Sequence, residues 1–166
     1  MQLMFKTRDF RVDLVKAVRT ILRLRHKDMA EVLGISRVAY SEAERRKISF
    51  SSERYHTLSN FLIGEIKKQV KELHSFKEHI KSIDSNDLSA TTRKLLEIRQ
   101  THLTKAGIPQ SEVSRAENRQ GGYRPEQQEK VRLLFLVEKW DRLNAIDSHL
   151  GFLHTLAAQL LSFQEG

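Results

Sequence analysis

The chain of 166 residues contains no cysteine and only two prolines and seven glycines. Without cysteine it can form neither a disulfide framework nor a thiolate metal site, which fits a reducing compartment. So few prolines and glycines favour long regular segments over loops. Because Leu, Lys, Arg and Glu are abundant and alternating β-branched patterns are few, the composition predicts an all-α protein.

Long apolar runs are also absent. No stretch reaches the roughly 18 apolar residues that a membrane-spanning helix needs. The first ten residues carry charges at Lys6, Arg8 and Asp9 and lack the apolar run of a signal peptide. We therefore expect a cytoplasmic protein with no membrane partner.

Motifs for catalysis and for metal binding are missing as well. His74 and His79 are spaced i, i+5, which places them on different faces of a helix, whereas a helical zinc pair prefers i, i+4. No glycine-rich phosphate loop or nucleophile elbow occurs, and Gly121-Gly122 alone indicates a turn. We expect no catalytic residues, no metal and no cofactor, and hence no enzyme.

Positive charge is in excess and lies in two separate blocks. The net charge is +8, and a basic chain favours an anionic partner, most often nucleic acid. Residues 1–62 hold 13 Lys and Arg against 7 Asp and Glu, and residues 89–137 hold 9 against 5.

The two basic blocks coincide with an internal repeat. The matching segments are 22–25 with 96–99, 34–36 with 107–109, and 41–46 with 114–119. Matching positions lie 74 apart before the glycine and 73 apart after it, so the second copy has lost one residue. Repeats of this kind indicate two copies of one structural unit.

Each copy is predicted to be a string of short helices. In the first, Ser36 is a suitable N-cap for a helix over 37–46, and Ser51 or Ser52 can cap another. The second runs from 92, breaks at Gly107, restarts at Pro109, breaks at 121–122 and restarts near 125. Proline fits the first turn of a helix, where its missing N–H costs nothing.

Apolar stripes predict further helices outside the repeat. Residues 63–83 form a heptad-like stripe, residues 82–89 are the expected linker, and residues 150–161 form a last amphipathic helix. Trp140 continues a stripe with Leu133, Leu136, Leu143 and Ile146, and we expect Trp140 to lie in the core. The expected segments are the first copy (1–62), the connecting helix and linker (63–89), the second copy (90–137) and a C-terminal helical segment (138–166).

The spacing around the first glycine is that of a helix-turn-helix. The turn needs a residue that tolerates positive φ, which Gly34 supplies, and close contact of the helices needs a small residue four positions earlier, which is Ala30. Ile35, Tyr40 and Ala43 then occupy the apolar positions that seal the core.

The stretch 29–44 (MAEVLGISRVAYSEAE) and, in the second copy, 107–118 (GIPQSEVSRAEN) resemble the lambda-repressor-like family of bacterial and phage regulators. With flanking helices the resemblance covers roughly residues 10–62 and 90–137. It implies two helix-turn-helix bundles, joined by a long helix and followed by a C-terminal helix. It also implies that the second helix of each motif enters the major groove of DNA.

The resemblance assigns candidate DNA contacts by position. The base-reading candidates are Arg37, Val38, Ala39 and Glu42 in the first copy and Gln110, Ser111, Glu112 and Arg115 in the second. The phosphate-contact candidates are His26, Arg45, Arg46, Lys47, Gln100, Arg119 and Arg124. The chemistry agrees, because Arg bonds guanine, Gln bonds adenine and small apolar side chains meet the thymine methyl.

The sequence departs from the family pattern at two places, one in the helix packing of the second copy and one on the expected DNA-contacting helix of the first copy. In the second copy Leu103 stands where the small residue belongs, so the first motif helix must shift or shorten. In the first copy, Glu42 either accepts a hydrogen bond from a cytosine amine or pairs with Arg46, four residues on.

The favoured function is a transcriptional regulator that binds specific double-stranded DNA. Two motifs in one chain would bind two DNA half-sites whose centres lie about one helical turn, roughly 34 Å, apart. A homodimer through 63–83 or 148–163 would add further motifs. The alternative is a protein-interaction module of the antitoxin or anti-activator type, favoured by the large Tyr40, the acidic Glu42 and the lost residue. RNA binding is a third hypothesis, which lacks the usual stacking aromatics.

Overall fold

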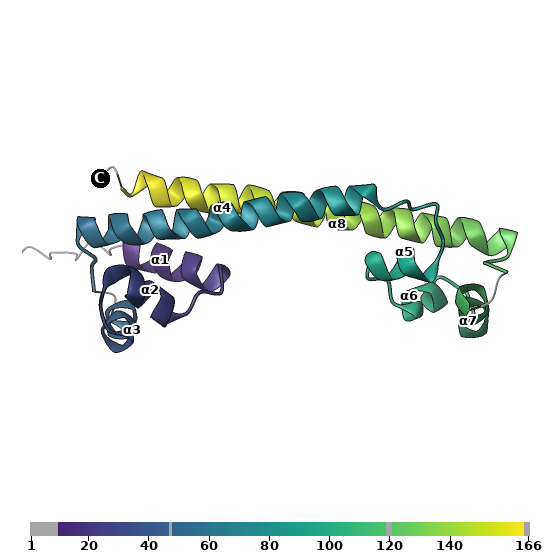
Figure 1. Ribbon diagram of the computed structural model, residues 1–166, viewed down its shortest axis with the longest axis horizontal. Helices are drawn as coiled ribbons and strands as arrows, with labels where there is room; N and C mark the ends of the chain where they lie inside the picture. Colours follow the sequence, from purple (N-terminus) through teal and green to yellow (C-terminus); the bar gives the residue numbers. More distant parts are fainter. Residues whose placement is uncertain (1–9, 47, 119–120, 165–166) are drawn as a thin grey trace, which may run out of the picture. The chain divides into compact units, whose positions relative to one another are not determined.

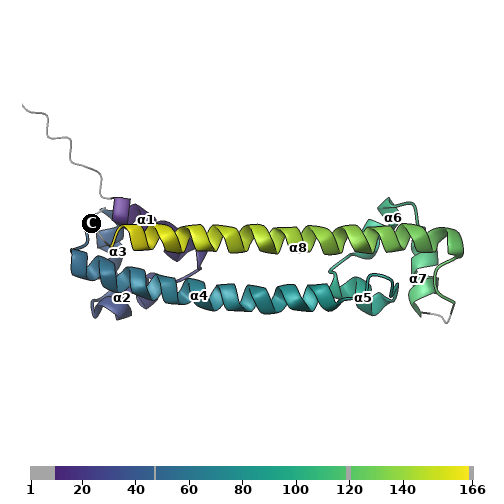
Figure 2. The same ribbon diagram turned by 90° about the horizontal axis from the view of Figure 1, so that it is seen from above.

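The computed structural model describes residues 10–46, 48–118 and 121–164, and within these ranges it is helical with no strand. The all-α prediction is therefore confirmed. Figure 1 and Figure 2 show the helices in two views. They are α1 (Phe10–Ile21), α2 (His26–Leu33), α3 (Arg37–Arg45), α4 (Ser52–Ser82), α5 (Ala90–Leu95), α6 (Gln100–Lys105), α7 (Gln110–Asn118) and α8 (Pro125–Ser162).

The chain divides into two compact units. Unit 1 comprises residues up to Lys71 together with those from Leu150 onward, and unit 2 comprises Glu72–His149. The two long helices α4 and α8 therefore each contribute one part to each unit. This division differs from the four consecutive segments expected from the sequence, because the C-terminal segment is shared between the units.

The core of unit 1 includes side chains of α1 and of the parts of α4 and α8 that belong to this unit. Val15 and Val18 of α1, Leu58 of α4 and Leu160 of α8 are all fully buried. The hydroxyl of Tyr55 on α4 donates a hydrogen bond to the carbonyl of Leu160 at 3.1 Å. The C-terminal part of α8 thus completes the unit that the N-terminal helices begin.

Unit 2 contains the part of α8 from Pro125 to His149. Val131 and Phe135 of α8 are fully buried, as is Leu103 of α6. The ammonium group of Lys139 donates to the carbonyl oxygen of Ile83 at 2.5 Å, which fastens the segment after α4 to α8. Residues 83–89 connect α4, which ends at Ser82, to α5, which begins at Ala90, within the segment where the sequence predicts a linker.

The sequence-based expectation for Trp140 is wrong. Trp140 is 64% exposed, and Leu133 and Leu136 of the same stripe are 52% and 50% exposed. Helix α8 carries apolar residues on more than one face, and Val131 and Phe135 belong to the face that the rest of unit 2 covers. Helical spacing identifies such stripes but does not say which of them is covered.

None of the helices in the described ranges has the length and apolar character needed to cross a lipid bilayer.

Candidate nucleic-acid interface

The turn between α2 and α3 has the geometry that its sequence predicts. Gly34 adopts φ +64°, the left-handed conformation that glycine tolerates best. The amide of Ile35 donates to the carbonyl of Ala30 at 3.0 Å, and Ser36 caps α3 by accepting from the amide of Ala39 at 3.1 Å. Ala30 and Tyr40 are buried where the two helices meet. These contacts leave the N-terminal end of α3 on the surface.

The turn between α6 and α7 is closed by the matching backbone bond, while Pro109 stands where the first copy has the capping Ser36. Gly107 adopts φ +86°, and the amide of Ile108 donates to the carbonyl of Leu103 at 3.1 Å. Leu103 is fully buried, and α6 has 6 residues where α2 has 8. Of the two alternatives expected for this helix, a shift or a shortening, the structure shows the shorter helix, and the turn itself is kept.

A buried ion pair holds α3 to α1 in the first repeat. Two nitrogens of Arg19 donate to the carboxylate of Glu44, Nε at 2.9 Å and Nη2 at 2.8 Å. The third nitrogen, Nη1, donates to the carbonyl of Leu24 at 2.8 Å. The side chains of Arg19 and Glu44 are 13% and 5% exposed. This bidentate geometry fixes α3 in orientation as well as in distance.

The second repeat contains the same pair at matching positions. Arg93 donates to Glu117 through Nε at 2.5 Å and through Nη2 at 3.0 Å, and its Nη1 donates to the carbonyl of Ile98 at 2.6 Å. The sequence analysis missed both pairs. The signal was present, because Arg19 and Arg93 lie 74 apart and Glu44 and Glu117 lie 73 apart, the offsets of the repeat.

The two repeats also share an uncommon backbone conformation at one matching position. Arg23 and Glu97, also 74 apart, are the two non-glycine residues with positive φ among the described residues, at 56° and 52°. Positive φ is uncommon outside glycine, so its recurrence at one repeat position is a specific likeness. Each residue follows the helix that carries the buried arginine.

Electrostatics keep both buried carboxylates ionised. Burial alone would raise the pKa of Glu44, but hydrogen bonds from Arg19 and His26 outweigh it, and the pKa lies below its ordinary value. The pKa of Glu117 is lowered in the same way, against burial, by Arg93 and Gln100. The groups that hold α3 and α7 are therefore charged at neutral pH.

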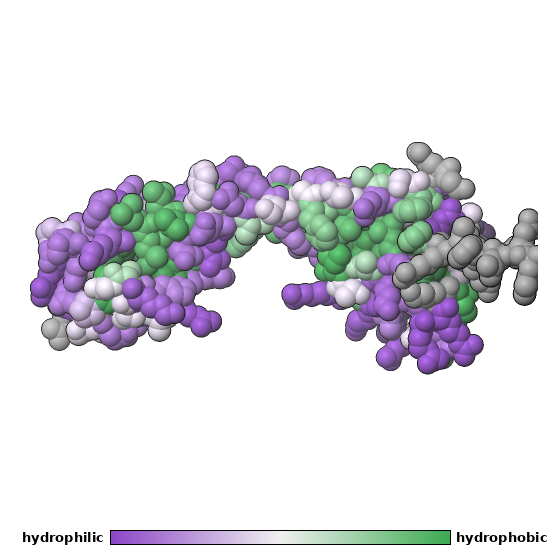
Figure 3. All heavy atoms as spheres, turned by 180° about the vertical axis from the view of Figure 1, so that it is seen from behind, coloured by the Kyte–Doolittle hydropathy of each residue, from purple (hydrophilic) through white to green (hydrophobic). Residues whose placement is uncertain are grey.

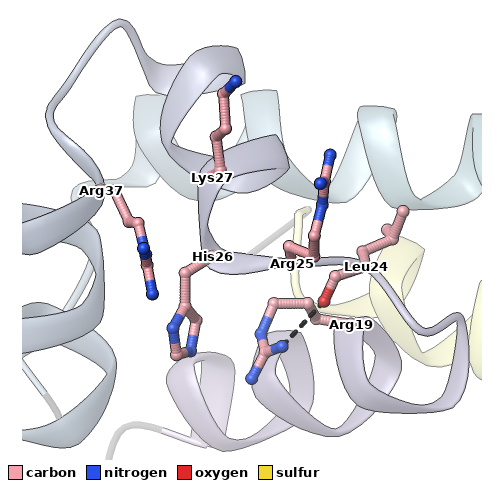
Figure 4. A pocket seen from close by; sticks show the side chains of 6 residues that line it. All are labelled: Arg19, Leu24, Arg25, His26, Lys27 and Arg37. Atoms are coloured by element: carbon pink, nitrogen blue, oxygen red, sulfur yellow. Dashed lines mark hydrogen bonds between the residues drawn. The ribbon is translucent and has the colours of Figure 1, made fainter.

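A basic pocket opens beside the N-terminal end of α3. It has a volume of about 440 Å³ and is lined by Arg19, Leu24, Arg25, His26, Lys27 and Arg37. Figure 4 shows Arg37 reaching from α3 toward the ring of His26, with the Arg19 guanidinium nearby. His26 Nε2 lies 3.1 Å from a carboxylate oxygen of Glu44, so this phosphate-contact candidate also supports the buried pair.

The other candidates of the first repeat fall into two groups. Arg37, Val38 and Ala39 are exposed at the start of α3, Val38 by 71%, and Arg37 makes no ion pair within the described residues. Glu42 instead pairs with Arg45 at 2.7 Å and with Arg46 at 2.8 Å. Of the two alternatives for Glu42, the structure shows the pairing with Arg46.

In the second repeat, a chain of hydrogen bonds reaches from the buried pair to the surface. Gln100 donates to Glu117 at 3.0 Å, and Gln110 donates to the side-chain oxygen of Gln100 at 2.9 Å. The amide of Gln110 is thereby held in one orientation on the first turn of α7. Its oxygen and its second N–H make no hydrogen bond to the residues that the structure describes. Ser111 beside it is exposed.

The remaining candidates of the second repeat bind one another. Glu112 pairs with Arg115 and with Arg124, each at 3.1 Å. Arg115 also donates to the carbonyl of Gly122 at 3.2 Å. These groups lie beside a polar groove of about 580 Å³ on α7, lined by Ser111, Glu112, Ser114, Arg115 and Asn118. Lys47 and Arg119, both phosphate-contact candidates, lie outside the described residues.

Comparison with protein-family models, with curated proteins and with solved structures gives no match. Each unit exposes the first turn of a short helix, α3 in unit 1 and α7 in unit 2. A buried Arg–Glu pair fixes each of these helices. One surface carries an arginine, Arg37, that makes no ion pair with any described residue, and the other carries a fixed amide, that of Gln110. Both groups can form two hydrogen bonds to a planar partner.

Proposed function

We propose that this protein is a regulator that binds specific double-stranded DNA through α3 and α7. The observation that carries the proposal is the repeated support of these two helices. Each follows a glycine turn with positive φ, is fixed by a buried Arg–Glu pair and exposes its first turn. A short helix presented in this way is suited to the major groove, where its N-terminal side chains reach base edges.

The first repeat offers a contact to guanine and a site for phosphate. Arg37 is exposed and has no carboxylate partner among the described residues, so its guanidinium is available for the O6 and N7 atoms of guanine. The cationic side chains of the pocket beside it suit a phosphate oxygen of the DNA backbone. Exposed Val38 can meet a thymine methyl.

The second repeat offers a contact to adenine. The bond from Gln110 to Gln100 leaves one acceptor and one donor on the Gln110 amide. These are the groups that pair with the N6 amine and N7 of adenine. Because the amide is already oriented, little side-chain entropy is lost on binding.

The test is selection of the full chain against a random double-stranded DNA pool at about 150 mM salt. Arg37→Ala and Gln110→Ala are compared with the wild type, and Lys67→Ala on α4 serves as a control that also removes one exposed positive charge. Each base-reading variant should relax one part of the enriched sequence, with a loss of about 1–3 kcal/mol at that base pair.

The outcomes separate the two repeats. Relaxation of two different parts by the two variants supports DNA reading by both helices. Relaxation by one variant assigns base reading to that repeat alone. If no sequence is enriched, or if Lys67→Ala relaxes the sequence as much as Arg37→Ala does, the proposal fails.

A protein-interaction role for α7 is the second candidate. Glu112 pairs with both Arg115 and Arg124 and offsets one of their two positive charges, so less of the positive charge of this surface is left for phosphate. A polar groove lies beside them. Capture of a protein by the wild type and its loss in Ser114→Arg, with DNA selectivity unchanged, would favour this role over DNA reading by α7.

A further inference from the structure

An exposed apolar stripe runs along α8 in unit 2. Leu133, Leu136, Val137 and Trp140 are 52%, 50%, 53% and 64% exposed. Their spacing of i, i+3, i+4 and i+7 places them on one face of the helix. The face that packs into unit 2 is a different one, since it carries the fully buried Val131 and Phe135. Figure 3 shows the apolar side chains that reach the surface seen from behind.

The size of the stripe fits the centre of a protein interface. Taking roughly 200 Å² for a fully exposed large apolar side chain, the four residues offer on the order of 400 Å², within the range of patches that mark interaction sites. A standard interface takes about 800 Å² from each partner, with an apolar centre and a polar rim. The stripe supplies the centre, and the exposed polar side chains around it supply the rim.

The charges beside the stripe are complementary to those of a second copy. Lys130 and Asp141 are both exposed and lie about three helical turns apart, so they share one edge of the stripe. Neither makes an ion pair within the described residues. In a two-fold pair of antiparallel helices centred between Leu136 and Val137, Lys130 and the partner's Asp141 lie on the same side of the contact. Their positions along the axis differ by two residues, about 3 Å, which the long lysine side chain can span. In a parallel two-fold pair the corresponding edges of the two helices lie on opposite sides of the contact, so Lys130 and the partner's Asp141 would not meet.

We propose that this face of α8 joins two copies of the chain as an antiparallel helix pair. In such a two-fold arrangement Leu133 of one copy meets Trp140 of the other, and the reverse contact forms by symmetry. This surface is not one of the two expected from the sequence. In those, residues such as Ile66, Ile80 and Leu153 are buried within their own unit. The proposal does not depend on DNA binding.

Trp140 makes the association directly measurable, because it is the only tryptophan in the chain. Sedimentation equilibrium and Trp emission are measured on the full chain from about 0.1 to 100 µM, a span that covers common homodimer affinities. We expect a rise from monomer to dimer mass, with the emission moving to shorter wavelength over the same concentrations. A mass that stays monomeric with unchanged emission would overturn the proposal, and the stripe would then belong to a different partner.

Variants locate the surface. Leu136→Lys should weaken dimerisation by at least about 100-fold, because it places a charge at the apolar centre of the interface. Phe152→Lys is the matched control, since Phe152 is also half-exposed on α8 but lies in unit 1, within the 148–163 surface. Loss of the dimer in Phe152→Lys with retention in Leu136→Lys would refute the proposal. Helicity by circular dichroism checks that both variants fold.

A charge exchange tests the antiparallel register. Lys130→Asp and Asp141→Lys should each weaken the dimer a few-fold, since each brings like charges together, and the double variant should restore it. Failure of the double variant to recover affinity would overturn the antiparallel pairing.

Discussion

Replacing Glu44 by glutamine tests whether the buried pair holds the first repeat together. The carboxylate accepts two hydrogen bonds from Arg19, at 2.9 Å and 2.8 Å, and faces the His26 ring at 3.1 Å. Glutamine keeps the shape and one acceptor. It loses the charge, and its amide NH₂ group turns a donor toward a donor of Arg19.

The expected loss is large for a single substitution. Breaking a buried ion pair from one side costs about 3–5 kcal/mol, because the remaining charge is left without a partner. Glutamine keeps one acceptor and Arg19 is slightly exposed, so we expect the lower end, about 3 kcal/mol. Single domains are stable by only about 5–15 kcal/mol. With an m-value of about 2 kcal/mol per molar urea, the midpoint should fall by about 1.5 M.

The assay is urea unfolding followed by circular dichroism at 222 nm, where the helices dominate the signal. Glu42→Gln is the matched control. It makes the same chemical change on the same helix, but the Glu42 side chain is 39% exposed and its partners Arg45 and Arg46 are more exposed still. Surface pairs contribute little to stability, so the midpoint of this variant should stay close to that of the wild type.

Equal shifts of the midpoint in the two variants would refute the reasoning, because the pair at Glu44 would then be worth no more than a surface pair. An unchanged midpoint in Glu44→Gln would refute it as well.

Further predictions concern acid stability and the turn. Both Glu44 and Glu117 have a folded-state pKa below the ordinary value of 4.5, so their contribution to stability is complete above that pH and is lost as the pH falls through the folded pKa. The urea midpoint should therefore stay constant from pH 7 to about 5 and then fall. The fall should be less steep in Glu44→Gln, which lacks one of the two carboxylates. A midpoint that rises on acidification would contradict the predicted direction. Gly34→Ala should destabilise by about 1–2 kcal/mol, because an L side chain is strained at φ +64°. Gly64→Ala, in the interior of α4 with open space around a Cβ, should stabilise by about 0.5–1 kcal/mol, and thermal melts of both variants would show whether the two signs differ.

The local features of both repeats could be read from the sequence. Gly34 and Gly107 adopt the positive φ that their spacing indicates, and Ser36 caps α3 as expected. These features depend on residues within about one helical turn of each other, so the sequence order already places the interacting groups together. The exposure of Arg37 follows from the same local register.

Contacts between distant residues were decided by the tertiary structure. Arg19 and Glu44 lie 25 positions apart, and only the packing of α1 against α3 brings them within hydrogen-bond distance. The recurrence of the same two residue types at Arg93 and Glu117 marks these positions in the sequence. Such a recurrence does not show that the two side chains are in contact. Gln100 and Gln110 likewise meet only because α6 and α7 cross.

Burial along α8 is a property that the sequence did not determine. Apolar residues recur on more than one face of this helix, and periodicity alone predicts burial equally for each of these stripes. The rest of unit 2 covers Phe135 completely and leaves Trp140 64% exposed. Helix formation is local and was predictable, whereas the choice of the covered face depends on which surfaces the other helices present to α8.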